Sequence, residues 1–193
     1  MGSSVCVNEK GEGKSSQPRS DETKFKIAKE KFERANWKTF GGNTISSKEA
    51  NSLVKNGENV LFVDIRTKEE RDVSFIPGSI DEEKFWTMDL KALKNTHIVS
   101  YCTIGFRSGL FAQKLKNKGL EHVYNSEGIV LWTHDSEVKL IHKNKNGKEE
   151  PAKKVHVYGA SWDLASNKYE TVKFSGLGGV GGTLYGIYSR MWR

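Results

Sequence analysis

Short apolar runs alternate with amphipathic stretches through the middle of the chain. The runs NVLFVDIR (59–66) and HIVSY (97–101) are continuous, which is typical of strands that are buried on both faces of a parallel sheet. Shorter strand candidates are NTIS (43–46), HVYN (122–125) and the end of FIPGSI (75–80). Between the runs, SSKEANSLVKNG (46–57) and RSGLFAQKLKNKG (107–119) carry apolar residues at helical spacing and end on glycine, and a further helix is expected around 81–94. Strands that alternate with helices predict an α/β fold, with a central parallel sheet and helices on both faces.

The flanks of this region have a different pattern. The N-terminus is rich in Gly, Ser and charge, and it precedes a helical stretch in which Phe25, Ala28, Phe32 and Ala35 recur at helical spacing. The far flank contains a basic hairpin pattern, a strand-like run and a glycine-heavy end. The sequence therefore predicts four segments: 1–19 disordered, 20–41 N-terminal helix and linker, 42–136 folded α/β domain, and 137–193 basic, Gly-rich C-terminal extension.

The charge of the chain lies mainly in those flanks. The net charge is +7, but residues 40–138 contain slightly more acidic than basic side chains. A folded nucleic-acid surface would place basic side chains on the structured region, so we expect no nucleic-acid partner. No apolar window is long enough to span a membrane, and no Cys/His cluster has the spacing of a metal site. The two cysteines are expected to be reduced thiols in a soluble cytoplasmic protein.

One of the two cysteines lies in a setting that suits a nucleophile. In YCTIGFRSG (101–109), Cys102 follows a buried strand, Gly105 permits a tight turn, and a helix begins near Arg107. Main-chain N–H groups and the positive end of that helix can surround the sulfur and stabilise a thiolate. The alternative is an inert buried cysteine, which needs neither the glycine turn nor the helix start. The predicted site is therefore Cys102 with its loop, and it requires no cofactor.

Two motifs resemble the rhodanese-like domain, a sulfurtransferase family. VDIRTKEERDVSFIPGSI (63–80) is similar to the family's entry motif, except that Phe75 stands where the family usually has His, and YCTIGFRS (101–108) is similar to its active-site loop. The resemblance covers about residues 42–136. It implies that Cys102 takes a sulfane sulfur from a small-molecule or protein donor, holds it as a persulfide and passes it to a thiol or other nucleophilic acceptor.

The resemblance also implies roles for the surrounding residues. The active-site loop would comprise Thr103, Ile104, Gly105, Phe106, Arg107 and Ser108, whose amides stabilise the terminal sulfur. Arg107 is expected to hold the loop through Glu69 or Glu70. Asp64 and Arg66 would support the neighbouring strand end.

Two other functions compete with sulfur transfer. Cysteine-based phosphatases and arsenate reductases have five residues between Cys and Arg, whereas four lie between Cys102 and Arg107, so the shorter loop should close around one sulfur atom. A catalytically quiet interaction module is the alternative from a different class.

The first six residues, MGSSVC, suggest a membrane contact. Gly2 resembles an N-myristoylation start, and Cys6 could accept a palmitoyl chain as the second signal that stable anchoring needs. The usual Ser or Thr is missing at position 6, and an expression scar can begin with the same letters. Acylation would make the cytoplasmic protein peripherally membrane-associated.

Overall fold

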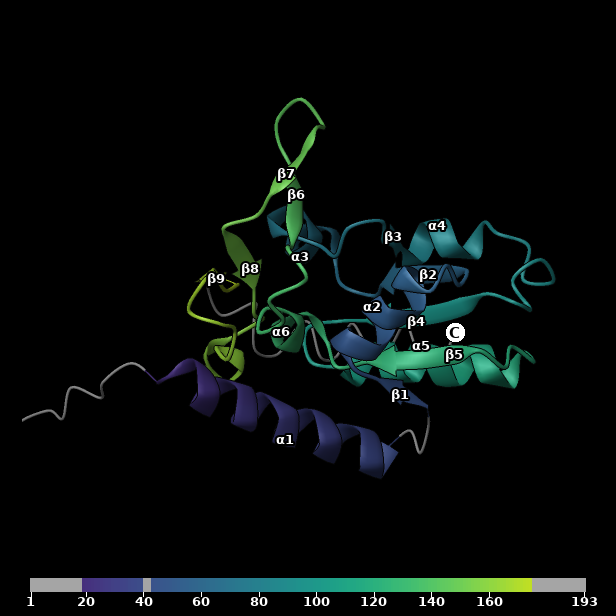
Figure 1. Cartoon of the computed structure of the whole chain (residues 1–193), viewed down its shortest axis with the longest axis horizontal. Helices are drawn as coiled ribbons and strands as arrows, with labels where there is room; N and C mark the ends of the chain where they lie inside the picture. The colour runs from purple at the N-terminus through teal and green to yellow at the C-terminus, as the bar shows by residue number, and fades with distance from the viewer. Residues whose placement is uncertain (1–18, 40–42, 175–193) are drawn as a thin grey trace, which may run out of the picture.

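A five-stranded parallel sheet forms the centre of the molecule. The computed structural model describes residues 19–39 and 43–174 (Figure 1). The strands lie in the order β1-β5-β4-β2-β3. Their bounds are β1 Thr44–Ile45, β2 Val60–Asp64, β3 Ile80–Asp81, β4 His97–Tyr101 and β5 Val123–Ser126. The two longest, β2 and β4, are central neighbours, as their continuous apolar sequences predicted.

Both faces of the sheet are covered. Along the central strands, Phe62 and Val99 belong to one apolar cluster, whereas the adjacent Val63 and Ile98 belong to another. This division follows from the two-residue period of a strand, which sends successive side chains to opposite faces. The fold is thus the α/β arrangement that the sequence predicted, with a buried parallel sheet between two packed layers.

Short helices follow the strands. They are α2 Ser47–Lys55, α3 Lys68–Val73, α4 Glu82–Trp86, α5 Phe106–Asn117 and α6 Ile129–Trp132. A capping box at Ser46 and Glu49 begins α2, and a second at Thr67 and Glu70 begins α3. The helix expected around 81–94 is shorter than predicted, because only α4 is α-helical and turns follow it.

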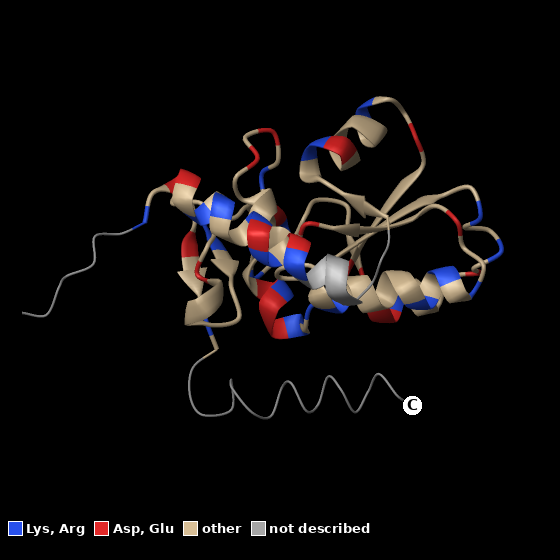
Figure 2. Cartoon of the chain, turned by 90° about the horizontal axis from the view of Figure 1, so that it is seen from below, with Lys and Arg blue, Asp and Glu red and all other residues tan. Residues whose placement is uncertain are grey.

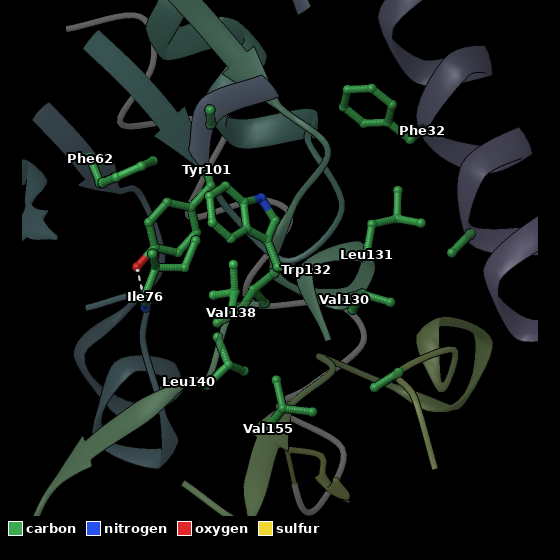
Figure 3. Close-up of a cluster of buried hydrophobic side chains, with 14 of the residues drawn as sticks. Phe32, Phe62, Ile76, Tyr101, Val130, Leu131, Trp132, Val138, Leu140 and Val155 are labelled. Atoms are coloured by element: carbon green, nitrogen blue, oxygen red, sulfur yellow. Dashed lines mark hydrogen bonds between the residues drawn. The ribbon is translucent and has the colours of Figure 1, made fainter. Parts of the chain in front are cut away.

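The segment after residue 137 packs on the same core. Its elements are the antiparallel pair β6 Ile141–Lys143 and β7 Glu149–Pro151, the parallel pair β8 Lys154–His156 and β9 Glu170–Val172, and the 3-10 turn η1 Ala160–Trp162. The hairpin turns at Gly147 as its sequence predicted. Figure 3 shows Val138, Leu140 and Val155 beside Tyr101 and Trp132 of the central domain. This segment therefore helps to build the core beneath the sheet.

A long N-terminal helix lies across one side of the domain. Helix α1, Asp21–Thr39, runs beside α5 and α6 (Figure 1), and the Thr23 amide donates to the Ser20 side chain at its start. The buried Ala28 and Phe32 join the core. Many other positions of the helix carry Lys, Arg, Asp or Glu, as the colours of its ribbon show (Figure 2). Phe25, which the spacing placed on the same stripe, is 43% exposed. Within the described ranges no helix combines the length and apolarity required to cross a membrane.

Candidate active site

The loop of Cys102 lies at the carboxyl end of the central strands. Cys102 directly follows β4, and Gly105 is the N-cap of α5 with φ 91°. That left-handed backbone conformation is strained for residues with a Cβ, so a glycine is required for the chain to turn from strand to helix here. The loop, the glycine turn and the helix start predicted from the sequence therefore come together at the edge where parallel sheets bind their ligands.

Two hydrogen-bonding groups lie at the sulfur of Cys102. The Gly105 N–H donates to Cys102 Sγ at 3.2 Å, and Ser108 Oγ lies 3.5 Å from the same sulfur. Since Gly105 caps α5, the positive end of that twelve-residue helix also lies at the sulfur. Cys102 itself is only 2% exposed, so the thiol lies inside the loop and not at the surface.

Arg107 is held by a buried carboxylate. Its Nη1 and Nη2 each donate to Glu70 at 2.7 Å, which forms a bidentate ion pair. Thr103 Oγ1 donates to the same carboxylate at 2.9 Å. Of the two carboxylates considered from the sequence, Glu70 is the partner, whereas Glu69 is exposed. Burial alone would raise the pKa of Glu70, but the hydrogen bonds and charge of Arg107 hold it at about 2.

A second buried ion pair supports the adjacent strand end. Arg66 Nε and Nη2 donate to the two oxygens of Asp64 at 2.9 and 2.7 Å, and both side chains are fully buried. Arg66 Nη2 also donates to the Ser74 carbonyl at 2.6 Å. Because these hydrogen bonds join the end of the strand to the segment that follows it, Asp64 and Arg66 shape the segment that carries Glu70.

The entry motif differs from its usual form at Phe75, which pairs with the C-terminal segment. The main chain of Phe75 forms a two-way hydrogen-bonded bridge with Ile141. The hairpin of β6 and β7 is therefore attached to the domain at Phe75, the position where the rhodanese-like family usually has a histidine.

The segment after β5 supports the back of the loop. The amides of Ile129 and Val130 donate to the carbonyls of Cys102 and Thr103 at 2.8 and 3.2 Å. Gly128 has φ 79°, and a Cβ there would lie 2.6 Å from the Cα of Ile104. The loop thus packs directly against the main chain at Gly128, a contact that neither motif indicated.

Helix α1 contacts the other side of the loop. A Cβ on Gly105 would lie 2.4 Å from the ring of Phe32, so this ring packs on the glycine that donates to the sulfur. Phe32 is 3% exposed, and an ion pair between Lys29 and Glu127 joins α1 to the segment after β5. Phe106, the last variable position of the loop, is half-buried.

Two side chains near the loop were missed by the sequence reasoning. Asn125 of β5 donates through Nδ2 to the Gly105 carbonyl at 2.9 Å and accepts from Ser108 Oγ at 2.7 Å. His156 of β8 lies with Nδ1 3.9 Å from Glu70. Asn125 could have been suspected as a polar residue in a strand candidate of the parallel sheet, whereas nothing in the sequence linked His156 to the site.

The acylation prediction concerns residues that the structure does not describe. Gly2 and Cys6 both lie outside the described ranges, so that prediction stays a prediction.

A buried cysteine within a strand-to-helix turn, faced by an amide and backed by an arginine–glutamate pair, defines a rhodanese-like architecture. Comparison with known proteins agrees with this, because residues 46–135 match the family model of the rhodanese-like domain, and the chain contains a domain of that family.

Related proteins are similar over about half of the chain. The chain is 32% identical over 101 residues to the tRNA uridine(34) hydroxylase of Corynebacterium urealyticum, covering 47% of this chain and 34% of that enzyme. It is 29% identical over 116 residues to the enzyme of that name from Buchnera aphidicola, covering 55% and 37%. The chain thus spans about a third of the length of these curated relatives. Among solved structures, a human single-domain sulfurtransferase is 25% identical, with coverage of 49% of this chain and 98% of that one and a TM-score of 0.43.

Proposed function

We propose that the protein is a sulfurtransferase that carries a sulfane sulfur on Cys102. In the first step the Cys102 thiolate attacks the outer sulfur of a donor, so a sulfur–sulfur bond forms and the rest of the donor leaves with the electron pair. In the second step a thiolate acceptor attacks the outer sulfur of the persulfide. The bond to Cys102 breaks, and the Cys102 thiolate is regenerated.

The observation that carries this proposal is the hydrogen bond from the Gly105 N–H to Cys102 Sγ at 3.2 Å. An amide fixed at a helix start stabilises negative charge on sulfur in both the resting and the transferring states. Such a donor costs no reorganisation during the reaction, because the positive φ of Gly105 already aims it at the sulfur.

The arrangement of Arg107 favours sulfur transfer over phosphate-ester hydrolysis. A phosphatase loop needs its arginine to bind the oxygens of the substrate, yet both terminal nitrogens of Arg107 donate to Glu70. Arg107 therefore supports the loop, and a donor without a large oxyanion suits the site better than a phosphate ester does.

Access to the sulfur requires a movement of the residues around it, since Cys102 is 2% exposed. Helix α1 is attached to this region through Phe32 and through the Lys29–Glu127 ion pair. We infer that displacement of this helix from the loop admits the donor and the acceptor.

Mass spectrometry of the donor-treated protein tests the proposal. The chain has two cysteines, so Cys6→Ser is a matched control for Cys102→Ser. After treatment with a persulfide donor, the wild-type protein and Cys6→Ser should gain one sulfur atom on Cys102, and a thiol acceptor should remove it. A folded wild-type protein that gains no sulfur on Cys102 would be a quiet interaction module instead.

The names of the relatives supply a second candidate, the oxidation of a uridine in tRNA. The similarity to those hydroxylases extends over 101 to 116 residues, which is about half of this chain. Incubation with tRNA, followed by nucleoside mass spectrometry, distinguishes sulfur transfer from uridine oxidation. Sulfur transfer predicts unchanged uridine and a loaded Cys102, whereas new hydroxyuridine that requires Cys102 would favour the second candidate.

A further inference from the structure

Ser108 lies between two acceptors but has a single hydroxyl proton. Its Oγ is 2.7 Å from Asn125 Oδ1 and 3.5 Å from Cys102 Sγ. Ser108 is fully buried and Asn125 is 3% exposed, so these contacts are made away from bulk water. A hydroxyl donates one hydrogen bond at a time, which means that the proton can be directed to the amide oxygen or to the sulfur.

The orientation of the Asn125 amide is fixed by the loop. Its Nδ2 donates to the Gly105 carbonyl at 2.9 Å, and a flipped amide would place two oxygens against each other. Oδ1 must then face Ser108 as an acceptor. Asn125 therefore competes with the sulfur for the hydroxyl proton and also holds the glycine whose N–H reaches that sulfur.

The charge of the sulfur decides whether the Ser108 hydroxyl donates to Asn125 or to Cys102. A neutral thiol is a weak acceptor, so the Ser108 proton stays on Asn125 and the thiol can donate to Ser108 Oγ. A thiolate accepts a charge-assisted hydrogen bond, which is about twice as strong as a neutral one. Rotation of the hydroxyl towards the sulfur is then favoured, although the bond to Asn125 is lost.

We propose that Asn125 is a positioning residue that sets the direction of the Ser108 hydroxyl during the reaction. The proton turns to Cys102 when its sulfur is charged, as nucleophile or as leaving thiolate, and returns to Asn125 when that sulfur is the neutral inner atom of a persulfide. Ser108 thus stabilises Cys102 only in its charged states, which is where a donor assists transfer. This inference rests on the proposed function for its role in the reaction.

Other charged groups also surround the loop, and the test must leave them unchanged. One of them is the guanidinium of Arg107, which lies in the first turn of α5 and is paired with Glu70. The remaining groups are Glu70 and His156 behind Arg107, the Asp64–Arg66 pair, and the Lys29–Glu127 pair. Substitutions at Ser108 and Asn125 alter none of these charges.

Titration of the thiolate by its ultraviolet absorbance tests the proposal. In a Cys6→Ser background Cys102 is the remaining cysteine, and the same titration of Cys102→Ser is subtracted. Ser108→Ala should raise the pH midpoint by about one unit, because the thiolate loses a donor. Asn125→Leu should lower the midpoint, because the Ser108 proton is released to the sulfur. Asn125→Leu should have no such effect when it is combined with Ser108→Ala.

Two results would overturn the proposal. One is an equal shift by Asn125→Leu with and without the Ser108 hydroxyl, which would mean that Asn125 only shapes the loop. The other is an unchanged midpoint in Ser108→Ala, a variant that removes one oxygen and decides the question even if Asn125→Leu does not fold. The titration uses no sulfur donor, so its result is independent of whether the persulfide of Cys102 forms.

Discussion

The buried pair of Glu70 and Arg107 gives the most direct prediction about stability. Glu70→Gln keeps the shape of the side chain but removes its charge, and it leaves the guanidinium of Arg107 buried opposite a neutral group. Folding lowers the pKa of Glu70 from 4.5 to about 2. At 1.36 kcal/mol for each pKa unit, this corresponds to about 3 kcal/mol of stability at neutral pH. Measured losses on breaking a buried pair are about 3–5 kcal/mol.

The sign of the pH dependence follows from the lowered pKa. A carboxylate with a depressed folded-state pKa contributes its full stability above the unfolded-state value and loses it as the pH falls towards the folded-state value. The stability difference between wild type and Glu70→Gln should therefore be about 3 kcal/mol at pH 7 and shrink between about pH 5 and pH 2.

Urea unfolding followed by circular dichroism at several pH values measures this difference. Glu69→Gln is the matched control, because the neighbouring glutamate is exposed and its substitution should leave the unfolding midpoint nearly unchanged. The reasoning is refuted if Glu70→Gln behaves like Glu69→Gln at pH 7, or if its effect is the same at every pH.

Three further predictions concern the loop and its surroundings. Gly128→Ala should destabilise the protein by about 2 kcal/mol more than Gly119→Ala. Both glycines have positive φ, but only a Cβ at Gly128 would meet the loop backbone. Equal losses of unfolding free energy in urea would contradict the close packing of Gly128 against the loop. Phe32→Ala should increase the alkylation rate of the Cys102 thiol several-fold. Phe25 is an exposed phenylalanine on the same helix, so Phe25→Ala should leave that rate unchanged. Equal alkylation rates in the two variants would show that α1 does not restrict access of the reagent to Cys102. Thiosulfate should be a poorer sulfur donor than a persulfide in steady-state rate measurements. Phe106→Arg adds a cation at the helix start, so it should reduce the difference between the two rates. A loss of thiosulfate activity in that variant would contradict the idea that a missing positive charge limits the use of thiosulfate.

The sequence predicted the sheet and the glycine turn after Cys102 because both have local signals. The runs that contain Phe62 and Val99 are continuous and short, and this pattern identifies strands buried on two faces. The loop from Cys102 to Arg107 is likewise a short segment, whose glycine and helix start can be recognised from neighbouring letters alone.

The contacts that hold the loop could not be predicted in the same way, because they join residues far apart in the chain. Phe32 lies about seventy positions before Gly105, on a helix whose apolar stripe gives no indication of what it packs against. The C-terminal segment has a basic, polar composition, yet Leu140 and Val155 are fully buried in the domain core. The extent to which Cys102 is enclosed follows from these distant contacts and was not foreseen.

The crystal structure of the sulfur-loaded protein would test the central claim most directly, namely that the strand-to-helix turn around Cys102 is built to hold a charged sulfur. After treatment with a persulfide donor, we predict an additional sulfur bonded to Cys102 Sγ, within hydrogen-bond distance of main-chain N–H groups between Thr103 and Ser108. A loaded sulfur that points away from those amides, or a donor-treated crystal with an unmodified Cys102, would contradict the account.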